Sequence, residues 1–571
     1  MKSLLRVTAN GLWLALCLPE NLRFRRAARD VAGAQRRLLL DVLRRNAETE
    51  FGRQYDFASI NSIADYQSRV PLSTYEDYQQ HVARISSGRQ RVLTRDPVLL
   101  LEPTSGSSAA TKLIPYTSSL KHELQHAIAP WIADLYLYDP QLMCGQTYWS
   151  VTPVTRRGER TAGGIPVGFE EDSEYLGGFE RALSQSVMAV PSLVKLIDEM
   201  EAFRYVTLLF LLRSRALGLI SVWNPTFLTL LTDRLAEWWQ ALADDIARGT
   251  ITAPAPIAAD LLARLRALNR PDKKRAGEIR DAFTAGNDPG EIHSHLWPHL
   301  RLVSCWTDAN AARYAAALEG LFPQARVQGK GLLATEGFVS FPLTGRAGAA
   351  LALRSHFLEF LPVAGDGEVD REHPRLAHEL DEGQRYSVVL TTGGGLYRYQ
   401  LNDVIEVVGR FRDCPLIRFV GRAANVSDWF GEKLNEIHVS RVLEDALKAC
   451  AVRPTFAMLA CELALPLPAY TLFIESHNLS DETQGTLGRH IEAGLVENYH
   501  YRYCRRLGQL DEVRVFRVEG GAIPAYLTAC QSRGQRAGDV KPVALDRLDG
   551  WAQIFRGRFT GRQNIASVSE R

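Results

Sequence analysis

The spacing of apolar residues predicts a helical N-terminal region. Residues 1–20 contain an apolar run that is too short to span a bilayer and lacks a small-x-small cleavage site, so we expect a helix packed on the body of the protein rather than a signal peptide. Residues 20–48 repeat apolar positions at helical spacing and are predicted to form one long helix, with a turn at residues 51–56 (FGRQYD). Residues 180–290 are predicted to be mainly helical.

Shorter apolar runs, typical of strands, flank the stretch 99–117 (LLLEPTSGSSAATKLIPYT). Upstream, in VPLSTYEDY, Ser73 or Thr74 is expected to cap a helix. The runs 98–101 and 112–116 are too short for helices, so the polar loop between them joins strand to strand. This separates it from a Walker loop, which opens directly into a helix.

The loop has the composition of a phosphate-binding loop. Gly106 allows the backbone N–H groups to turn inward, and Lys112 supplies a point charge. Hydroxyl donors are contributed by Thr104, Ser105, Ser107 and Ser108. An ordinary polar surface turn has the same composition, so the loop alone does not decide between the two. A helix capped within 117–119 is predicted to follow, and its apolar face consists of Leu120, Leu124, Ala127, Ile128, Trp131, Ile132 and Leu135.

The second half of the chain is predicted to begin with short strands and to end in a compact α+β unit. The predicted strands are 300–306, 326–334, 349–354, 387–392 and 396–408. Gly393, Gly394 and Gly395 are expected to form a tight hairpin turn, and residues 365–384 an acidic exposed loop. After Gly421 we expect a helix at 437–450, strands at 456–463 and 470–475, a helix near 480–502 and a strand at 513–518.

Composition limits the function classes. A chain of 571 residues with 46% hydrophobic and 23% charged residues is typical of a globular protein with two or more domains, and a net charge of +2 argues against a dedicated nucleic-acid surface. Eight cysteines without a C-x-x-C pair predict reduced thiols and a cytoplasmic location. The histidines of HSHLWPH (His293, His295 and His299) have no Cys or carboxylate partner at metal-ligand spacing, which favours a structural role over a zinc site.

Three polar clusters follow the predicted phosphate loop. In LLATEG, Glu336 is a candidate Mg²⁺ ligand and Thr335 a candidate phosphate contact. In YRYQLNDV, which contains Tyr397, the carboxylate of Asp403 is placed to accept both ribose hydroxyls of a nucleotide. GRAANVSDWFGEKLNE offers a hinge at Gly421 and Arg422 and an exposed Lys433. Each cluster alone also fits a strand end, a hairpin or a capped helix start.

The order of these motifs resembles the acyl acid amido synthetases of the auxin-responsive promoter (Gretchen Hagen) family, a branch of the adenylate-forming enzymes. The resemblance runs from FGRQYDF and VPLSTYEDY through SVWNPTF to GDVKPVAL. It implies an α/β fold with a β-barrel, in which residues 1–420 form a large N-terminal domain that binds ATP and the acyl acid. Residues 421–571 would form a small, mobile α+β lid, and the protein would act as a monomer without a membrane span.

The resemblance also implies a reaction. A carboxylic acid would attack ATP in the presence of Mg²⁺, and an amine, most simply an amino acid, would take the acyl group from the resulting adenylate. Lys541 in GDVKPVAL resembles the lysine that the lid of such enzymes brings to the reacting phosphate. Lys112 and Lys433 are the other two candidate catalytic lysines. Tyr397 and Arg422 are implied ATP contacts. The acyl pocket is expected near Tyr116, Trp223 and Phe227.

Departures from the family pattern leave two alternatives open. Ala109 and Ala110 stand where the family loop has a glycine. Asn402 replaces the glycine of the ribose motif, and asparagine is the residue type that best replaces glycine in left-handed conformations. The tyrosine and first serine of the family's Y-A-S-S-E are absent from the motif that ends in Glu336. A coenzyme A ligase would share the first half-reaction, and a degenerate, non-catalytic nucleotide-binding protein would perform neither.

Overall fold

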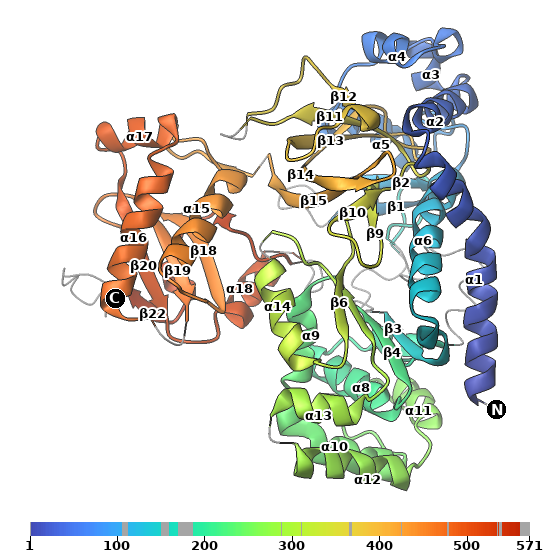
Figure 1. Cartoon of the computed structure of the whole chain (residues 1–571), viewed down its shortest axis with the longest axis vertical. Coiled ribbons are helices and arrows are strands. Elements are labelled where there is room, and N and C mark those ends of the chain that lie inside the picture. Colours follow the sequence, from blue (N-terminus) through green and yellow to red (C-terminus); the bar gives the residue numbers. More distant parts are fainter. Residues whose placement is uncertain are drawn as a thin grey trace. The chain divides into compact units, whose positions relative to one another are not determined.

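The computed structural model describes most of the chain as two compact units (Figure 1). The described residues are 2–104, 112–149, 159–168, 187–286, 288–309, 311–364, 368–423, 425–476, 479–533, 535 and 540–559. The first unit comprises Met1–Pro362, Arg371–Leu401 and Ile405–Phe419. The second comprises Val363–Asp370, Asn402–Val404 and Val420–Arg571.

The first unit begins with two helices where the sequence predicted one long helix over 20–48. α1 (Lys2–Ala27) and α2 (Val31–Asn46) are separate because the Asp30 carboxylate caps α2, accepting a hydrogen bond of 3.0 Å from the N–H of Gly33. The predicted turn at FGRQYD is also wrong, since most of it lies in α3 (Glu50–Gln54).

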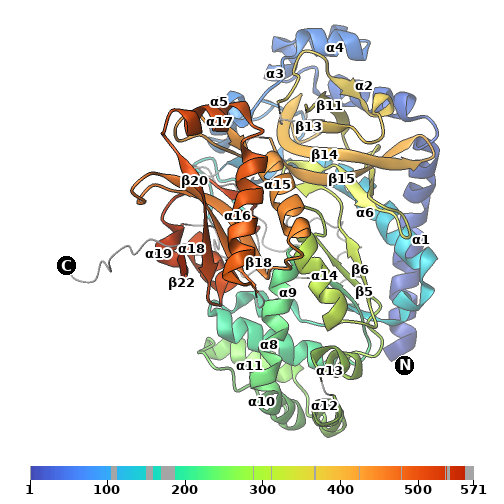
Figure 2. The ribbon, with the colours of Figure 1, turned by 60° about the vertical axis from the view of Figure 1, so that its left-hand side comes forward.

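The hairpin around the predicted phosphate loop is confirmed. α4 (Ile63–Arg69) and α5 (Tyr75–Ser86) precede it, and α5 is capped by Thr74 as predicted, with Asp77 completing a capping box. β1 (Val98–Pro103) and β2 (Leu113–Thr117) pair antiparallel. α6 (Ser118–Tyr138) follows directly, its predicted apolar face is buried, and it runs alongside α1 in both ribbon views (Figure 1, Figure 2).

A four-stranded parallel sheet occupies the middle of the first unit. Its strands, in order, are β3 (Gln146–Trp149), β4 (Leu217–Ser221), β5 (Leu302–Cys305) and β6 (Arg326–Gly329). The helices of this region are α8 (Met200–Arg213), α9 (Pro225–Thr232), α10 (Leu235–Arg248), α11 (Ala259–Leu268), α12 (Lys273–Ala285), α13 (Pro289–Leu296) and α14 (Ala311–Leu321). The mainly helical prediction for 180–290 missed β4, because a short buried apolar run has the same composition in a strand and in a helix.

A seven-stranded sheet follows. Its order is β12 (Arg375–Leu376), β11 (Phe357–Pro362), β13 (Arg385–Thr391), β14 (Tyr399–Phe411), β15 (Cys414–Arg422), β10 (Ala349–Leu351) and β9 (Ser340–Pro342). Because this order has two ends, the described strands form an open sheet, and the predicted closed barrel is not found among them. β7 (Leu333–Ala334) and β8 (Gly337–Phe338) form a separate small hairpin, so the predicted strand 326–334 is two strands.

The second unit is a compact α+β body, and the residues after Gly421 make up most of it. A five-stranded sheet has the order β21 (Leu545–Asp546), β18 (Phe456–Glu462), β19 (Ala469–Glu475), β20 (Asp511–Val518) and β22 (Gly557–Phe559). Its helices are α15 (Glu436–Ala449), α16 (Asp481–Leu495), α17 (Tyr499–Arg506), α18 (Ala522–Ser532) and the short α19 (Trp551–Ile554). β16 (Val426–Ser427) and β17 (Leu434–Asn435) form a small antiparallel pair. The predicted helix over 480–502 is divided between α16 and α17.

Other sequence expectations concern cysteines, histidines and membrane spans. The eight cysteines all lie within the described residues, none of them forms a disulfide, and six are buried. His293 is buried in α13, with Nδ1 2.9 Å from the carbonyl oxygen of Leu321. Within the described residues, no cluster of three His, Cys, Asp or Glu side chains is suited to hold a metal ion. None of the described helices combines the length and apolar character that a membrane crossing needs.

Candidate functional site

The base of the predicted phosphate loop is well defined. The N–H of Thr104 donates a hydrogen bond of 2.8 Å to the carbonyl oxygen of Lys112, which closes the β1–β2 hairpin around the loop. The predicted contacts Ser105, Gly106, Ser107 and Ser108 lie outside the described residues, as do Ala109 and Ala110. The hairpin therefore fixes the two ends of the loop.

Lys112 lies against an aromatic ring from α5. Its ammonium nitrogen is 5.5 Å from the centroid of the Tyr75 ring, and the Tyr75 hydroxyl accepts a hydrogen bond of 2.7 Å from the N–H of Leu113. The lysine itself is half-buried. Tyr75 thus holds both the charge and the backbone at the start of β2.

A side chain of β2 connects this hairpin to the LLATEG turn. The hydroxyl of Tyr116 donates a hydrogen bond of 2.7 Å to the carbonyl oxygen of Thr335, although 219 positions separate the two residues. Tyr116, predicted near the acyl pocket, is 1% exposed. The two segments that were predicted to contact phosphates are therefore held side by side.

Glu336, the predicted metal ligand, lies in the two-residue turn between β7 and β8. Its side chain is half-buried, and its Oε1 lies 3.4 Å from the hydroxyl of Tyr399, the first residue of β14. Burial first, and then the Glu336 charge, raise the pKa of Tyr399. Tyr399 therefore stays a neutral hydrogen-bond donor beside the carboxylate. Sequence reasoning did not single out Tyr399.

Tyr397, a predicted ATP contact, is a core residue instead. Its side chain is 0% exposed and its hydroxyl donates to the carbonyl oxygen of Leu93 at 2.8 Å. The next residue, Arg398, has a left-handed φ of 47° and makes two hydrogen bonds, of 3.0 and 3.1 Å, to the buried carboxylate of Glu359. This buried ion pair holds the backbone of the YRY segment in place.

The predicted ribose motif lies where β14 bends. Asn402 has a φ of 61°, so asparagine does occupy the left-handed position that a glycine was expected to hold. Oδ1 of Asp403 accepts a hydrogen bond of 3.1 Å from Nε of Arg422. The Asp403 side chain is 5% exposed, whereas that of Arg422 is 50% exposed. Arg422 and Asp403, predicted separately, are thus brought together.

The other two predicted lysines lie in the second unit. Lys433 is exposed and has a left-handed φ of 44°, directly after Glu432, whose buried carboxylate accepts hydrogen bonds from the N–H groups of Trp429 and Phe430. Lys541 is exposed, and its carbonyl oxygen accepts a hydrogen bond of 3.2 Å from the Tyr526 hydroxyl. Both lysines therefore project from backbone that buried groups hold in place.

Aromatic residues gather at the carboxyl ends of the parallel strands. Trp223 follows β4, and its ring centroid is 6.0 Å from that of Trp306, which follows β5. Lys330, the residue after β6, has its ammonium 4.9 Å from the Trp223 ring centroid and 2.6 Å from Oγ of Ser221. Phe227 is half-buried in α9. Ligands of α/β proteins bind at this edge of parallel sheets.

Lys330 was missed by the sequence analysis. It also lies 5.7 Å from the ring centroid of Trp131 on α6, so two tryptophans flank one ammonium group. Its position directly after β6 was hidden in the sequence, because the predicted strand 326–334 runs across it. No local motif marks it.

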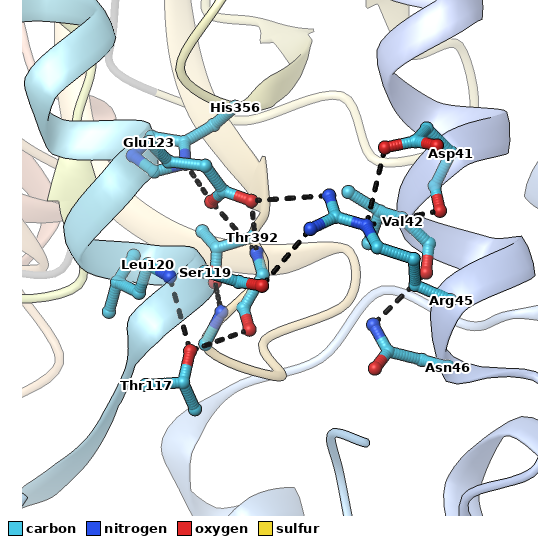
Figure 3. Close-up of polar contacts among 12 residues, drawn as sticks. Asp41, Val42, Arg45, Asn46, Thr117, Ser119, Leu120, Glu123, His356 and Thr392 are labelled. Atoms are coloured by element: carbon cyan, nitrogen blue, oxygen red, sulfur yellow. Dashed lines mark hydrogen bonds and ion pairs between the residues drawn. The ribbon is translucent and has the colours of Figure 1, made fainter. Parts of the chain in front are cut away.

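Glu123 and His356 form a buried pair that links α6 to the triple-glycine loop and to β8 (Figure 3). The Glu123 carboxylate accepts hydrogen bonds of 2.8 and 3.0 Å from the N–H of Gly393 and lies 3.1 Å from Nδ1 of His356. Nε2 of His356 accepts a hydrogen bond of 3.0 Å from the N–H of Phe338. Nδ1 must then carry the proton and donate it to Glu123. The dyad ties α6 to the triple-glycine loop and to β8, two residues beyond Glu336.

Comparison with known protein families shows which family the chain belongs to. The model described as "GH3 family N-terminal domain" matches residues 21–327, "GH3 family central domain" matches 349–422 and "GH3 family C-terminal domain" matches 438–546. The chain belongs to the GH3 family. This confirms the resemblance to the Gretchen Hagen family that the order of motifs indicated.

Plant GH3 enzymes are among the similar curated proteins. "Indole-3-acetic acid-amido synthetase GH3.4" of Arabidopsis thaliana is 26% identical over 438 residues, covering 75% of this chain and 73% of that protein. "Indole-3-acetic acid-amido synthetase GH3.8" of Oryza sativa subsp. indica is 26% identical over 544 residues, covering 90% of this chain and 88% of that protein.

Two solved structures share the fold. "AtGH3.15 acyl acid amido synthetase in complex with 2,4-DB" has a TM-score of 0.80 at 20% identity, over 95% of this chain and 97% of that one. A 2-hydroxyisobutyryl-CoA ligase in complex with an adenylate has a TM-score of 0.50 at 11% identity, over 92% of this chain and 90% of that one. At these identities the likeness is one of fold: the chain has the fold of the acyl acid amido synthetase and, more distantly, that of the CoA ligase.

Proposed function

We propose that this GH3 protein is an ATP-dependent ligase that joins a carboxylic acid to an amine through an acyl adenylate. The observation that carries the proposal is the hydrogen bond of 2.7 Å between Tyr116 and Thr335, which holds the phosphate-loop hairpin beside the turn that bears Glu336. The names of the plant relatives, which are amido synthetases, support the same reaction class.

In the first half-reaction, an oxygen of the substrate carboxylate attacks the α-phosphorus of ATP. A bond forms between that oxygen and phosphorus, and the bond to pyrophosphate breaks. Negative charge grows on the phosphate oxygens, where the ammonium of Lys112 and the donors of the hairpin loop stabilise it. Because Tyr75 holds Lys112 in place, little reorganisation is needed when the charge develops.

The carboxylate of Glu336 fits a Mg²⁺ ion. It is partly accessible, it is a hard oxygen ligand, and Mg²⁺ is often held by one or two carboxylates together with substrate phosphates. When bound, the ion would neutralise charge on the phosphates. The neutral hydroxyl of Tyr399 keeps Glu336 oriented whether or not the ion is bound.

The nucleoside end of ATP is assigned to Asp403 and Arg422. With one oxygen held by Arg422, the Asp403 carboxylate is oriented to accept hydrogen bonds from ribose hydroxyls. The left-handed backbone of Asn402 sets the bend at which this carboxylate is presented.

In the second half-reaction, the amine attacks the carbonyl carbon of the adenylate. The new carbon–nitrogen bond forms, the nitrogen loses a proton, and AMP leaves with the bridging oxygen. We propose that residues 421–571 act as a lid that rotates about Gly421 and Arg422 between the two half-reactions, with Lys541 serving only the first. An amino acid is the proposed acceptor.

The acid is proposed to bind near Trp223 and Phe227, and the contacts of Lys330 refine this region. An ammonium held by Ser221 and flanked by Trp131 and Trp223 makes a cluster that is aromatic and positively charged. Such a cluster suits a flat acid whose ring contacts tryptophan. We therefore expect aryl or indolyl acids to be preferred over fatty acids.

We also propose that the protein is a cytoplasmic monomer. The eight cysteines, all among the described residues, form no disulfide and six of them are buried, which supports a reducing compartment.

Acid-dependent exchange of labelled pyrophosphate into ATP tests the proposal. We expect exchange with at least one member of a panel of aryl, indolyl and fatty acids, and none when the acid is omitted. Mass spectrometry of the complete reaction with mixed amino acids and coenzyme A then identifies the acceptor. An amide supports the proposal, a thioester identifies a coenzyme A ligase, and absence of exchange with every acid identifies a non-catalytic protein.

A further inference from the structure

A cavity lies in the first unit, apart from every residue assigned above to ATP, Mg²⁺ or the acid. It has a volume of about 600 Å³ and is bordered by α1, α2, α6 and the segment after β10. This volume is within the range of small-molecule sites, roughly 300–1,000 Å³. Its lining is Arg23, Arg26, Ala27, Asp30, Ala34, Arg37, Leu38, Asp41, Arg45, Ser119, His122, Glu123, His126, Leu353 and Arg354.

The lining is rich in hydrogen-bond donors. Five arginines and two histidines face three carboxylates. A guanidinium carries five N–H donors and a carboxylate offers only acceptors, so the donors far outnumber the acceptors in this cavity. Helical spacing alone explains why arginines share a solvated face of α2, but it does not explain why arginines from α1, α2 and the segment after β10 line the same hollow.

The carboxylates of the lining are already engaged. Asp30 caps α2 and lies 3.1 Å from Arg37. Asp41 lies 3.2 Å from Nε of Arg45. Each of these partners keeps further N–H groups, because one contact uses only part of a guanidinium.

A single carboxylate behind the cavity serves several of its cations. Glu20 accepts a close hydrogen bond from Arg354 and lies 3.3 Å from Arg23. Its Oε2 is also 4.0 Å from Nε2 of His126. Burial lowers the pKa of His126, so the Glu20 charge is shared by the two guanidinium groups of Arg23 and Arg354, which leaves this wall of the cavity positive.

Glu123 lies at the inner end of the cavity, and its carboxylate is hydrogen-bonded to groups in the interior of the protein. Its oxygens accept hydrogen bonds from Gly393 and from the Nδ1–H of His356, and the nearest contact to a lining arginine is 3.9 Å, to Arg45 (Figure 3). Arg45 also donates a hydrogen bond of 3.0 Å to Oγ of Ser119. An incoming anion would avoid Glu123 and meet the guanidinium groups nearer the surface.

We propose that this cavity is a second ligand site, which binds a small molecule carrying two or more negative charges as phosphate or carboxylate groups. Arg26 and Arg37 are exposed members of the lining and would contact the anion. The inference does not depend on the proposed ligase reaction.

Calorimetric titration of the full chain at low salt tests the inference. Citrate and inorganic phosphate are titrated separately, so that the two arms distinguish a polycarboxylate from a phosphate ligand. Binding of at least one is expected, and Arg26→Ala and Arg37→Ala should each weaken it by about tenfold or more, the scale of losing a charge-assisted hydrogen bond.

Arg36→Ala is the matched control. Arg36 lies exposed on α2, donates a hydrogen bond of 3.3 Å to the carbonyl oxygen of Asn61, and is not part of the lining. It should leave the affinity unchanged, and unaltered circular dichroism should show that each variant is folded. Absence of binding by both probes would overturn the inference. So would binding that the two lining variants leave unchanged, because the anion would then occupy another site.

Discussion

The Nε–H of Arg422 donates a hydrogen bond of 3.1 Å to Oδ1 of Asp403, and the two residues belong to different motifs of the sequence. Asp403 is carried by β14 and Arg422 is the last residue of β15. The guanidinium therefore orients the carboxylate that we assign to the ribose, on the residue that we propose as the lid hinge. If both proposals hold, this one contact would link nucleotide binding to the position of the lid.

Replacing Asp403 should weaken nucleotide binding. Asp403→Ala removes a carboxylate that would accept charge-assisted hydrogen bonds, and we expect a loss of roughly 2–3 kcal/mol in the affinity for ATP, measured by calorimetry. Glu406→Ala is a control on the same strand, where the carboxylate contacts Arg418 at 3.1 Å, and it should bind ATP as the unmodified protein does. Equal ATP affinity in the folded Asp403→Ala variant would remove Asp403 from the site.

Replacing Glu336 should change the response to metal. Glu336→Gln keeps the shape but loses the charge that a hard cation prefers, so pyrophosphate exchange should fall and respond weakly to added Mg²⁺. Tyr399→Phe keeps the carboxylate and removes only the hydroxyl 3.4 Å away that orients it, so the rate should fall while the Mg²⁺ response is retained. A Glu336→Gln variant with an unaltered rate and Mg²⁺ dependence contradicts the assignment.

Lys541 should separate the two half-reactions. Lys541→Ala is expected to reduce pyrophosphate exchange by about 10²-fold, the scale of losing one preorganised charge, while amide formation from a prepared acyl adenylate stays near its original rate. Lys448→Ala, at an exposed lysine on α15, should affect neither. Equal losses in both halves would indicate general damage to the second unit, and no loss would exclude the assigned role.

Breaking the buried ion pair between Arg398 and Glu359 should destabilise the protein more than breaking an exposed ion pair. Arg398 is 5% and Glu359 0% exposed. Removing one partner leaves the other charge buried, so Arg398→Met should lower the free energy of unfolding by about 3–5 kcal/mol in urea titrations. Arg418→Met breaks an exposed pair with Glu406 and should cost about 1 kcal/mol or less. Similar losses in the two variants would contradict this account.

Glu436 should make stability depend on pH. Burial raises its pKa above the ordinary 4.5, against the hydrogen bonds from Asn425 and Ala544 and the charge of Arg422, while the charge of Asp403 raises it further. The folded state then binds the proton more tightly than the unfolded state, so stability falls as pH rises from about 4.5 towards the folded-state pKa.

Glu436→Gln removes that titration, and the pH slope of its unfolding free energy should be flatter than that of the unmodified protein. Glu444→Gln, at an exposed carboxylate on α15, should keep the original slope. Urea titrations at several pH values measure both. An unchanged slope in Glu436→Gln would show that another group titrates.

Local patterns in the sequence were enough to predict many elements. The α6 face, the β1–β2 hairpin and the α+β body after Gly421 follow from spacing that short-range contacts enforce. The break between α1 and α2 was missed although Asp30 is a good cap, because the apolar spacing continues across it. β4 was missed because its five residues are all buried, which removes the alternation that marks a strand.

Within the site, the sequence identified residues more readily than contacts. Asn402 was correctly expected to replace a glycine, since that property is local. Tyr397 was assigned to ATP and lies in the core, because the left-handed φ of Arg398 interrupts the alternation that would set its side-chain direction. The pairs Tyr116–Thr335 and Glu123–His356 join positions more than 200 apart, and no local pattern encodes such a pairing.

The central claim, that the acid is activated as an adenylate, is tested most directly by following its oxygen. A substrate acid labelled with ¹⁸O in its carboxylate is incubated with the protein, ATP, Mg²⁺ and the amine acceptor, and the nucleotide products are weighed by mass spectrometry. We predict that AMP acquires one ¹⁸O atom, because the bridging oxygen of the adenylate comes from the acid. Label in inorganic phosphate with formation of ADP, or AMP without label, would contradict the account.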